Sequence, residues 1–369
     1  MSLGAAELLE RIRALDLPEK VRIMNVCGGH ERSITQAGLR NALPPAIELI
    51  PGPGCPVCVC PEEDVYQAIQ LAMNEDLTLA TFGDMLRVPV NVRKTEIRSL
   101  EQAKAAGADV VPVASPQEIV ALARANPDRR VVFFAAGFET TTAPVAAMMA
   151  QGVPDNLLLL LSGRLTWPAV SMLLNSGEVG FDALIAPGHV GTVMGPEEWE
   201  FVVEDHNVPA AIAGFDSDSL LAAIYSVLRQ LQSGKPALDN CYTRVVQSGG
   251  NPTARRFLSQ VMEVTDATWR GIGTIPASGF SLRDVYAAHD ARKLLPDYGD
   301  DARRRVGEMP AGCDCAQVVL GRIYPDQCRI FGAACTPRTP VGPCMVSDEG
   351  ACRIWWSSGK RTRVEQAAE

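Results

Sequence analysis

The chain has 369 residues, 47% of them hydrophobic and 21% charged, which is typical of a globular protein of two or three domains rather than a disordered one. Its net charge of −9 and the lack of a Lys/Arg-rich block argue against a nucleic-acid partner, because phosphate binding needs clustered cations. The first residues lack the apolar core of a signal peptide, and the longest apolar run, NLLLLLSG, is too short to cross a bilayer. We therefore expect a cytoplasmic protein that does not bind a membrane.

Short apolar, β-branched runs alternate with helical segments along the first 220 residues. The runs that we interpret as strands span residues 21–26, 46–51, 77–82, 108–113, 129–137, 156–163, 182–188 and 210–215. Apolar residues recur every three or four positions in the intervening segments 63–75, 116–126 and 142–151, as in amphipathic helices. The alternation predicts an α/β fold in which helices cover both faces of parallel sheets.

The spacing of these elements predicts two Rossmann-like α/β domains facing a cleft. The first spans residues 1–125 and the second 126–240, and a third region, 241–369, is rich in Cys, Pro and Gly. Within this region we interpret WRGIGTIPASG, residues 269–279, as a turn-rich packing segment. The Arg/Asp-rich residues 297–308 are interpreted as a solvated linker.

Polar motifs follow the predicted strands at their carboxyl ends. They are CGGHE at 27–31, GPGCPVC at 52–58, GDMLR at 83–87, GFETTTAP at 137–144, PGHVG at 187–191 and GFDSDS at 214–219. Ligands of open parallel sheets bind in the crevice beyond these ends, and glycine lets the backbone approach a ligand closely. The sequence therefore predicts a site in the cleft.

Eleven cysteines are more than packing requires, and in a reducing compartment such numbers indicate metal or redox chemistry. Six of them lie in one loop-rich segment: Cys313, Cys315, Cys328, Cys335, Cys344 and Cys352. A bound metal would stabilise such a segment. A zinc cage of four cysteines is one interpretation, but zinc sites usually use two closely spaced pairs and only one is present. Widely spaced cysteines beside Pro and Gly favour an iron–sulfur cluster.

Cys55 and Cys58 form a C-x-x-C pair, which can be a redox dithiol, half of a zinc site, or inert. A thioredoxin-like motif should open a helix directly after a strand, and here Pro-Gly-Pro-Gly intervenes. Since no second such pair lies nearby, we prefer a dithiol at the mouth of the cleft. Cys60 has no evident role.

Cys27 and His30 share a Gly-Gly loop at a strand end. We expect His30 to lower the pKa of the Cys27 thiol and so generate the thiolate that a metal ligand or a nucleophile requires. Glu139, His189 and Asp84 are further candidates, because each follows a predicted strand. The alternative for GFETTTAP is that a threonine merely caps the next helix.

Taken together, VCGGHE, PGPGCPVCV, TFGDMLRVP, GFETT, APGHV, WRGIGTIPASG and the closing cysteine segment resemble the signature blocks of the HypD family of NiFe-hydrogenase maturation proteins. The blocks occur in the family's order from residue 26 to residue 352. The resemblance implies a hydrogenase maturation scaffold on which the Fe(CN)2CO unit of the NiFe active site is assembled. Such a protein has redox activity, because cluster and dithiol electron transfer support the attachment of cyanide and CO, but it is not a conventional turnover enzyme.

The resemblance also assigns residues and partners. The family pattern C-x14-C-x6-C-x16-C, which holds a 4Fe-4S cluster, falls on Cys313, Cys328, Cys335 and Cys352. It leaves Cys315 and Cys344 as a redox pair. Cys27 would bind the iron of the Fe(CN)2CO unit, and Cys55 and Cys58 would exchange electrons. His30, Glu139 and His189 would move protons or hydrogen-bond cyanide. The partners implied are a HypC-type chaperone and a HypE-type cyanide donor.

Two alternatives remain at this stage. The first is an iron–sulfur-dependent thiol–disulfide reductase in which Cys55 and Cys58 reduce a partner. The second is a zinc-stabilised α/β hydrolase that uses Cys27 and His30. The hydrolase is the weaker one, because no acidic third member of a triad is identifiable.

Overall fold

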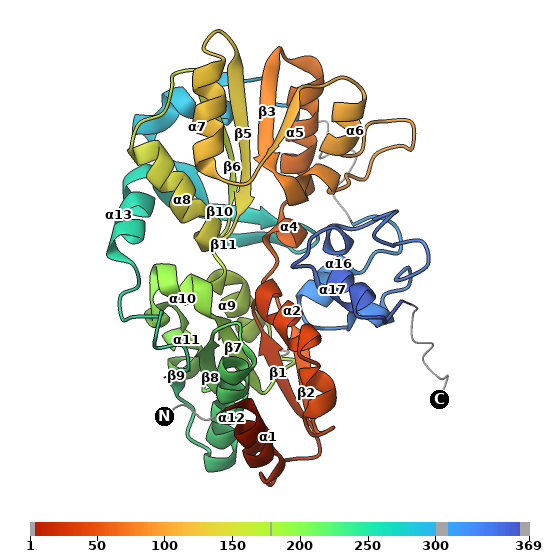
Figure 1. Cartoon of the computed structure of the whole chain (residues 1–369), viewed down its shortest axis with the longest axis vertical. Coiled ribbons are helices and arrows are strands. Elements are labelled where there is room, and N and C mark those ends of the chain that lie inside the picture. The colour runs from red at the N-terminus through yellow and green to blue at the C-terminus, as the bar shows by residue number, and fades with distance from the viewer. Residues whose placement is uncertain (1–3, 178, 300–308, 362–369) are drawn as a thin grey trace.

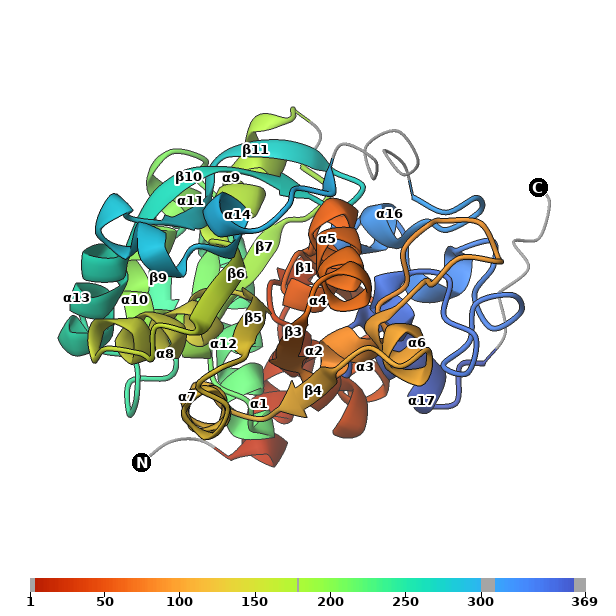
Figure 2. The same ribbon diagram turned by 90° about the horizontal axis from the view of Figure 1, so that it is seen from above.

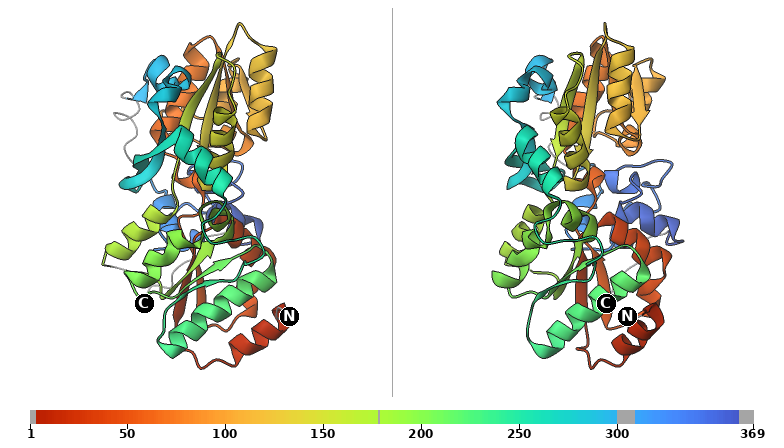
Figure 3. Two further views of the ribbon diagram at one scale, coloured as in Figure 1. Left: turned by 90° about the vertical axis from the view of Figure 1, so that its left-hand side faces the viewer. Right: turned by 60° about the vertical axis from the view of Figure 1, so that its left-hand side comes forward.

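The computed structural model describes residues 4–177, 179–299 and 309–361. Two parallel β-sheets lie one above the other along the long axis, and the C-terminal cysteine-rich region packs beside their junction (Figure 1). Both side views in Figure 3 show the same stacking. The predicted α/β fold with a separate cysteine-rich region is therefore confirmed.

The first sheet has five parallel strands in the order β2–β1–β7–β8–β9. Its strands are β1 (Val21–Asn25), β2 (Ile47–Pro51), β7 (Ala183–Pro187), β8 (Ala210–Ala213) and β9 (Leu238–Asn240). Asn25 at the end of β1 pairs with Pro51 of β2 and with Ile185 of β7. The loops that follow these three strands consequently leave the sheet at one edge.

The second sheet has four parallel strands in the order β4–β3–β5–β6. They are β3 (Leu77–Phe82), β4 (Val110–Val113), β5 (Arg130–Gly137) and β6 (Leu157–Gly163). Nearly every residue of β5 and all of β6 are buried, because helices cover both faces of the sheet. This burial explains why both strands are continuous apolar runs instead of alternating ones.

All eight runs interpreted as strands form strands β1 to β8, but the two parallel sheets are not divided at residue 125. The first sheet combines two strands from the predicted first domain with three from the second. The second sheet, residues 77–163, is inserted between β2 and β7. Alternating periodicity identifies strands and helices but not which strands pair, and consecutive strands are neighbours in only about two-thirds of cases.

Helices flank both sheets (Figures 1 and 2). Their bounds are α1 Ala5–Arg13, α2 Gly28–Gln36, α3 Leu39–Ala42, α4 Pro56–Val59, α5 Glu62–Asn74, α6 Leu100–Ala105, α7 Pro116–Ala125, α8 Glu139–Ala150, α9 Trp167–Asn175, α10 Gly188–Met194, α11 Glu200–Glu204, α12 Ser217–Ser233, α13 Pro252–Val261, α14 Ala291–Leu294, α16 Cys315–Val319 and α17 Ala351–Ser357. The contact between α10, which follows β7, and α8, which follows β5, shows that the carboxyl ends of the two sheets face each other.

An antiparallel hairpin, β10 (Met262–Trp269) and β11 (Gly273–Leu282), bridges the two sheets by contacting β6 and α9. It contains the segment that the sequence predicted to be turn-rich. Its glycines and proline obscure the residue pattern of a strand, and the hydrogen bonds to β10 hold the segment in strand conformation. The buried Trp269 indole donates to the Ser278 hydroxyl (2.9 Å). Of the predicted linker 297–308, residues 300–308 lie outside the described residues.

The C-terminal region packs against the second sheet and the loop of the C-x-x-C pair. Cys313, Cys344 and Trp355 share one apolar core with Val65 of α5 and Leu79 of β3. Between short helices the region consists of loops and turns. In the part of the chain that the structure describes, no helix is long and apolar enough to cross a membrane.

Candidate functional site

Cys27 lies between β1 and α2, where the chain leaves the sheet and turns into a helix. Its backbone is extended (φ −156°), and it occupies the N-cap position of α2. The sulfur makes no capping hydrogen bond, but the backbone N–H groups of Gly29 and His30 lie near enough to lower its pKa. Free N–H groups at a helix N-terminus favour negative charge, so the position of Cys27 would stabilise its thiolate form.

The charge state of Cys27 differs from the sequence expectation. Burial, followed by the negative charge of Glu349, raises the pKa of the Cys27 thiol to about 12. The His30 ring does not lower it, because burial holds the pKa of His30 near 4 and its Nε2 bonds to the Ala213 carbonyl (3.0 Å). Only the backbone N–H of His30 acts in the expected direction. The sulfur is therefore a thiol that would lose its proton on binding a metal cation.

The GPGCPVC loop lies directly on Cys27. The carbonyl of Gly54 accepts from the N–H of Gly28 (3.1 Å), and a Cβ at Gly54 would come within 2.4 Å of the Cys27 backbone. Only glycine allows this approach. Cys55 and Cys58 follow as a disulfide, 5% and 2% exposed, with Cys55 at the N-cap of the short helix α4 and Cys58 within it.

A narrow cavity brings three parts of the chain together. Cys27, Cys55 and Cys58 line it from the first sheet, and Cys344 and Glu349 line it from the C-terminal region. The thiol predicted to bind iron, the C-x-x-C pair and one member of the predicted C-terminal redox pair thus border one space.

Glu349 is a site residue that the sequence interpretation missed. It lies against Gly28, where a Cβ would be 2.4 Å from the Cβ of Glu349. Desolvation by the surrounding chain, with a further contribution from the Asp84 carboxylate, raises the pKa of Glu349 to about 7. A signal existed, since an acidic residue stands three positions before Cys352 in SDEGAC. Nothing in that spacing indicates contact with the first sheet.

His189 and His30 lie on either side of Phe215. The ring centroid of Phe215 is 3.9 Å from that of exposed His189 and 4.9 Å from that of buried His30. The Phe215 ring also covers Gly29 beside Cys27. Phe215 therefore separates the buried His30 from the exposed His189 next to the Cys27 loop.

Glu139 is fully buried at the start of α8 and belongs to the second sheet. Its two carboxylate oxygens accept from the backbone N–H and the hydroxyl of Thr166, both at 2.7 Å. Burial raises the pKa of Glu139 to about 7. Asp84, after β3, is exposed. Its negative charge raises the pKa of Glu349, which is its link to the Cys27 site.

We expect Glu139→Gln to remove a component of the pH dependence of folding. The carboxyl keeps its proton to about pH 7 in the folded chain and loses it near pH 4.5 in the unfolded chain. Stability must therefore fall as pH rises through this window, by roughly 3 kcal/mol relative to the variant. Urea denaturation of both proteins at a series of pH values measures the difference, and parallel stability profiles would contradict the expectation.

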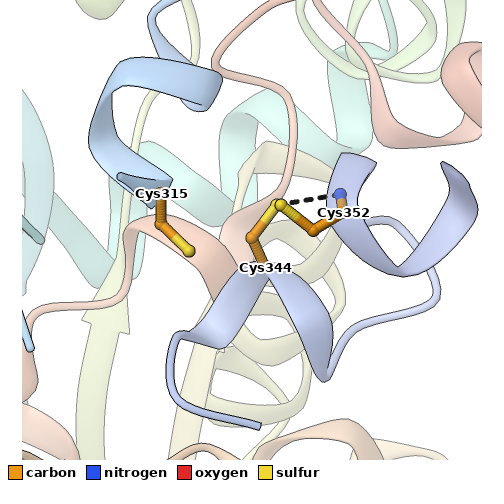
Figure 4. A group of neighbouring side chains, drawn as sticks. All are labelled: Cys315, Cys344 and Cys352. Atoms are coloured by element: carbon orange, nitrogen blue, oxygen red, sulfur yellow. Dashed lines mark hydrogen bonds between the residues drawn. The ribbon is translucent and has the colours of Figure 1, made fainter. Parts of the chain in front are cut away.

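The six C-terminal cysteines are buried on loops and short helices. The sulfur atoms of Cys315, Cys344 and Cys352 all lie within 4.8 Å of one another (Figure 4). Cys313 extends this group, because its Sγ is 3.3 Å from that of Cys315. Gly342 stands beside both, where a Cβ would be 2.5 Å from each sulfur. A side chain at position 342 would therefore collide with these two sulfur atoms, and glycine avoids the collision.

The electrostatics of this group favour one anionic sulfur. Hydrogen bonds from Cys315 and Cys352 lower the pKa of Cys344, and the backbone N–H of Cys352 also donates to its sulfur (3.3 Å). The hydrogen bonds of Cys352 to Cys315 and Cys344 raise the pKa of Cys352. Burial raises the pKa of Cys335 to about 11 and also raises that of Cys328. Thiolates gathered this closely are the donor set of zinc and of iron–sulfur centres.

The cysteine group contains members of both sets assigned by the resemblance. Cys315 and Cys344 come from the predicted redox pair, whereas Cys352 comes from the predicted cluster ligands. The division into four ligands and one pair therefore stays a prediction. Cys60 lies apart with its sulfur 3.5 Å from the Ser162 hydroxyl, and burial raises its pKa to about 12.

Comparison with known proteins gives consistent matches over nearly the whole chain. The HypD model, described as the hydrogenase formation hypA family, matches residues 4–359. The chain is 41% identical over 364 residues to the hydrogenase maturation factor HypD of Rhodobacter capsulatus, covering 98% of this chain and 95% of the relative. Identity to the factor of that name from Azotobacter vinelandii is 38% over 370 residues, with 98% and 95% covered. The chain is 35% identical over 367 residues to the hydrogenase maturation factor HypD of Cupriavidus necator, covering 96% of this chain and 94% of the relative.

Proposed function

The chain belongs to the HypD family of hydrogenase maturation factors, and from this we propose that it is the scaffold on which the Fe(CN)2CO unit is assembled. The iron unit is its cargo. Cys27 would anchor the iron, and the Cys55–Cys58 pair would exchange electrons beside it. A HypC-type chaperone and a HypE-type cyanide donor would deliver the components.

One observation carries the proposal: Cys27, the Cys55–Cys58 disulfide and Cys344 line the same narrow cavity. An anchoring thiolate, a two-electron couple and a sulfur-rich centre need to be adjacent only if electrons pass between them. Closing the Cys55–Cys58 disulfide from two thiols releases two electrons and two protons, and reopening it takes them up.

The chemistry of Cys27 fits an iron anchor. Low-spin iron bearing cyanide and CO prefers a soft anionic ligand, and a thiolate supplies one. The backbone N–H groups of Gly29 and His30 already lower the pKa of this thiol and would compensate the charge of the thiolate. Glu349 would hold the proton that leaves the thiol, because the pKa of its carboxyl is about 7. His189, which is exposed to solvent, would move protons or hydrogen-bond cyanide from the solvent side.

The C-terminal cysteines fit a metal–sulfur centre, since the buried sulfurs of Cys315, Cys344 and Cys352 already converge there. Cys313, Cys328, Cys335 and Cys352 would hold a 4Fe-4S cluster, with Cys315 and Cys344 as the adjoining redox pair. Such a cluster would supply single electrons when bound.

Replacing Cys27 with alanine should abolish the assembled iron unit. The chain would be purified without oxygen from cells that co-express HypC-type and HypE-type partners. Its infrared spectrum would be recorded where the triple bonds of cyanide and CO absorb. We expect the bands of the original chain to be absent from Cys27→Ala, a complete loss rather than a shift, because the variant lacks the anchoring thiolate.

Cys241→Ala is the matched control, because Cys241 directly follows β9, is partly buried and does not line the cavity. It should retain the bands. Bands of equal intensity in Cys27→Ala would reject the anchor. Their absence from the original chain, with both partners bound, would reject the scaffold itself.

The reductase alternative is less well supported. Cys55 and Cys58 are buried, and a protein disulfide could not reach them without displacing the loops around Cys27. Thiol–disulfide exchange requires direct attack of one sulfur on another, so access is essential.

A further inference from the structure

Arg270, in the segment WRGIGTIPASG, is a buried cation that the proposed function leaves unused. Its backbone N–H donates to the Val59 carbonyl (3.0 Å), in the chain just after the Cys55–Cys58 pair. Its Nη2 donates to the Pro89 carbonyl (2.7 Å) and lies 3.4 Å from a carboxylate oxygen of Glu62. The side chains of Arg270 and Glu62 are only 2% and 5% exposed.

The guanidinium is incompletely paired. Its Nε and Nη1 are buried and have no hydrogen-bond partner among the described residues. Unpartnered N–H groups on a buried cation cost several kcal/mol, and such groups normally have a partner. The opposing Glu62 carboxylate does not supply one to these two nitrogens, since its contact is with Nη2.

The C-terminal cysteine group would carry negative charge beside a cavity that Arg270 also lines once it holds a cluster. Arg270 and Cys313 line one cavity of the C-terminal region, next to Gly271. The hairpin therefore holds a buried cation at a cavity that Cys313 also lines.

We propose that Arg270 donates hydrogen bonds through Nε and Nη1 to the metal–sulfur centre of the C-terminal cysteines and raises its reduction potential. This inference rests on the proposed function, in which those cysteines hold a 4Fe-4S cluster. Arg270 is a positioning and tuning residue, since it acts through the centre and not on the iron cargo.

The physical reason is charge. One-electron reduction adds a negative charge to a buried centre, and a cation at fixed distance stabilises the reduced form more than the oxidised one. Hydrogen bonds to the sulfur atoms act in the same direction and are among the determinants of cluster potential. Glu62 opposes both effects, because its carboxylate partly neutralises Arg270.

The test compares Arg270→Gln and Glu62→Gln in the full chain reconstituted with ferrous iron and sulfide under exclusion of oxygen. Dithionite titration followed by electron paramagnetic resonance gives the cluster potential. Arg270→Gln should make reduction at least tenfold less favourable, which is 59 mV for one electron. Glu62→Gln should raise the potential, because it leaves the cation uncompensated. Shifts in opposite directions distinguish tuning from structural damage, which would move both variants the same way.

Iron and acid-labile sulfide content keep the two proposals separate. If all proteins held the full complement of iron and sulfide, two results would overturn the role of Arg270: cluster potentials equal to that of the original chain, or potentials shifted in the same direction in both variants. Either result would leave the scaffold proposal standing. An original chain that binds zinc, or takes up no iron, would overturn the cluster and this inference together. Should Arg270→Gln fail to fold, Arg270→Lys retains the charge and should lower the potential by less than the tenfold step. No lowering there would also overturn the role of Arg270.

Discussion

Replacing Gly54 with alanine is expected to destabilise the chain by roughly 3 kcal/mol or more and to separate the C-x-x-C loop from Cys27. A Cβ there would lie 2.4 Å from both the Cα and the N atom of Cys27 and 2.5 Å from the carbonyl carbon of Val26. These are backbone atoms at the end of β1, so no side-chain rotation relieves the overlap. The loop must move, and the Gly28–Gly54 hydrogen bond must break.

Two measurements follow the effect of Gly54→Ala. Thermal unfolding should begin at a lower temperature, and iodoacetamide should alkylate Cys27 faster once the loop lifts. Gly83→Ala is the matched control, because Gly83 also follows a strand and a Cβ there meets nothing within 4 Å. If the two variants unfolded at the same temperature with equal alkylation rates, the close approach of Gly54 would not matter.

Replacing Glu31 with alanine is expected to cost about 3–5 kcal/mol, because it leaves buried donors and a cation unpaired. Glu31 is 1% exposed and accepts from the side chains of Asn25 (3.1 Å), Arg40 (2.7 Å) and Trp355 (2.7 Å). The Trp355 bond joins α2, which begins beside Cys27, to α17, which carries Cys352. Its loss should therefore loosen the cysteine-rich region from the first sheet.

Urea denaturation of Glu31→Ala, together with the rate of iron release from the loaded chain, measures both effects. Trp355→Phe should cost only about 1–2 kcal/mol, since it removes one donor and keeps the ring beside Tyr324. The exposed pair Glu7–Arg11 has the same 2.7 Å separation as Glu31–Arg40, and Glu7→Ala should cost less than 1 kcal/mol. Equal losses for Glu31→Ala and Glu7→Ala would show that the buried network carries no special weight.

Local pattern was sufficient for the strands and for the chemistry at their ends. Each of the eight apolar runs became a strand, because burial on both sheet faces demands continuous apolar residues and leaves a clear signal. Cys27, Cys55 and Cys58 could be placed at one edge of a sheet for the same reason, since the carboxyl ends of parallel strands share an edge. The resemblance to the family came from a series of short sequence blocks that lie far apart in the chain, from residue 26 to residue 352.

Contacts between distant segments were not readable from the sequence. Periodicity does not encode pairing, so the insertion of one sheet into the other stayed hidden. Glu349 and Arg270 become site residues only when the C-terminal region docks on Gly28 and the hairpin docks on Val59. Burial likewise decided the charge of Cys27 and His30, whose sequence proximity suggested an acid–base pair. The sequence by itself determined which reactive groups the protein carries, while tertiary structure alone decided their neighbours and protonation, because both depend on what excludes water from each group.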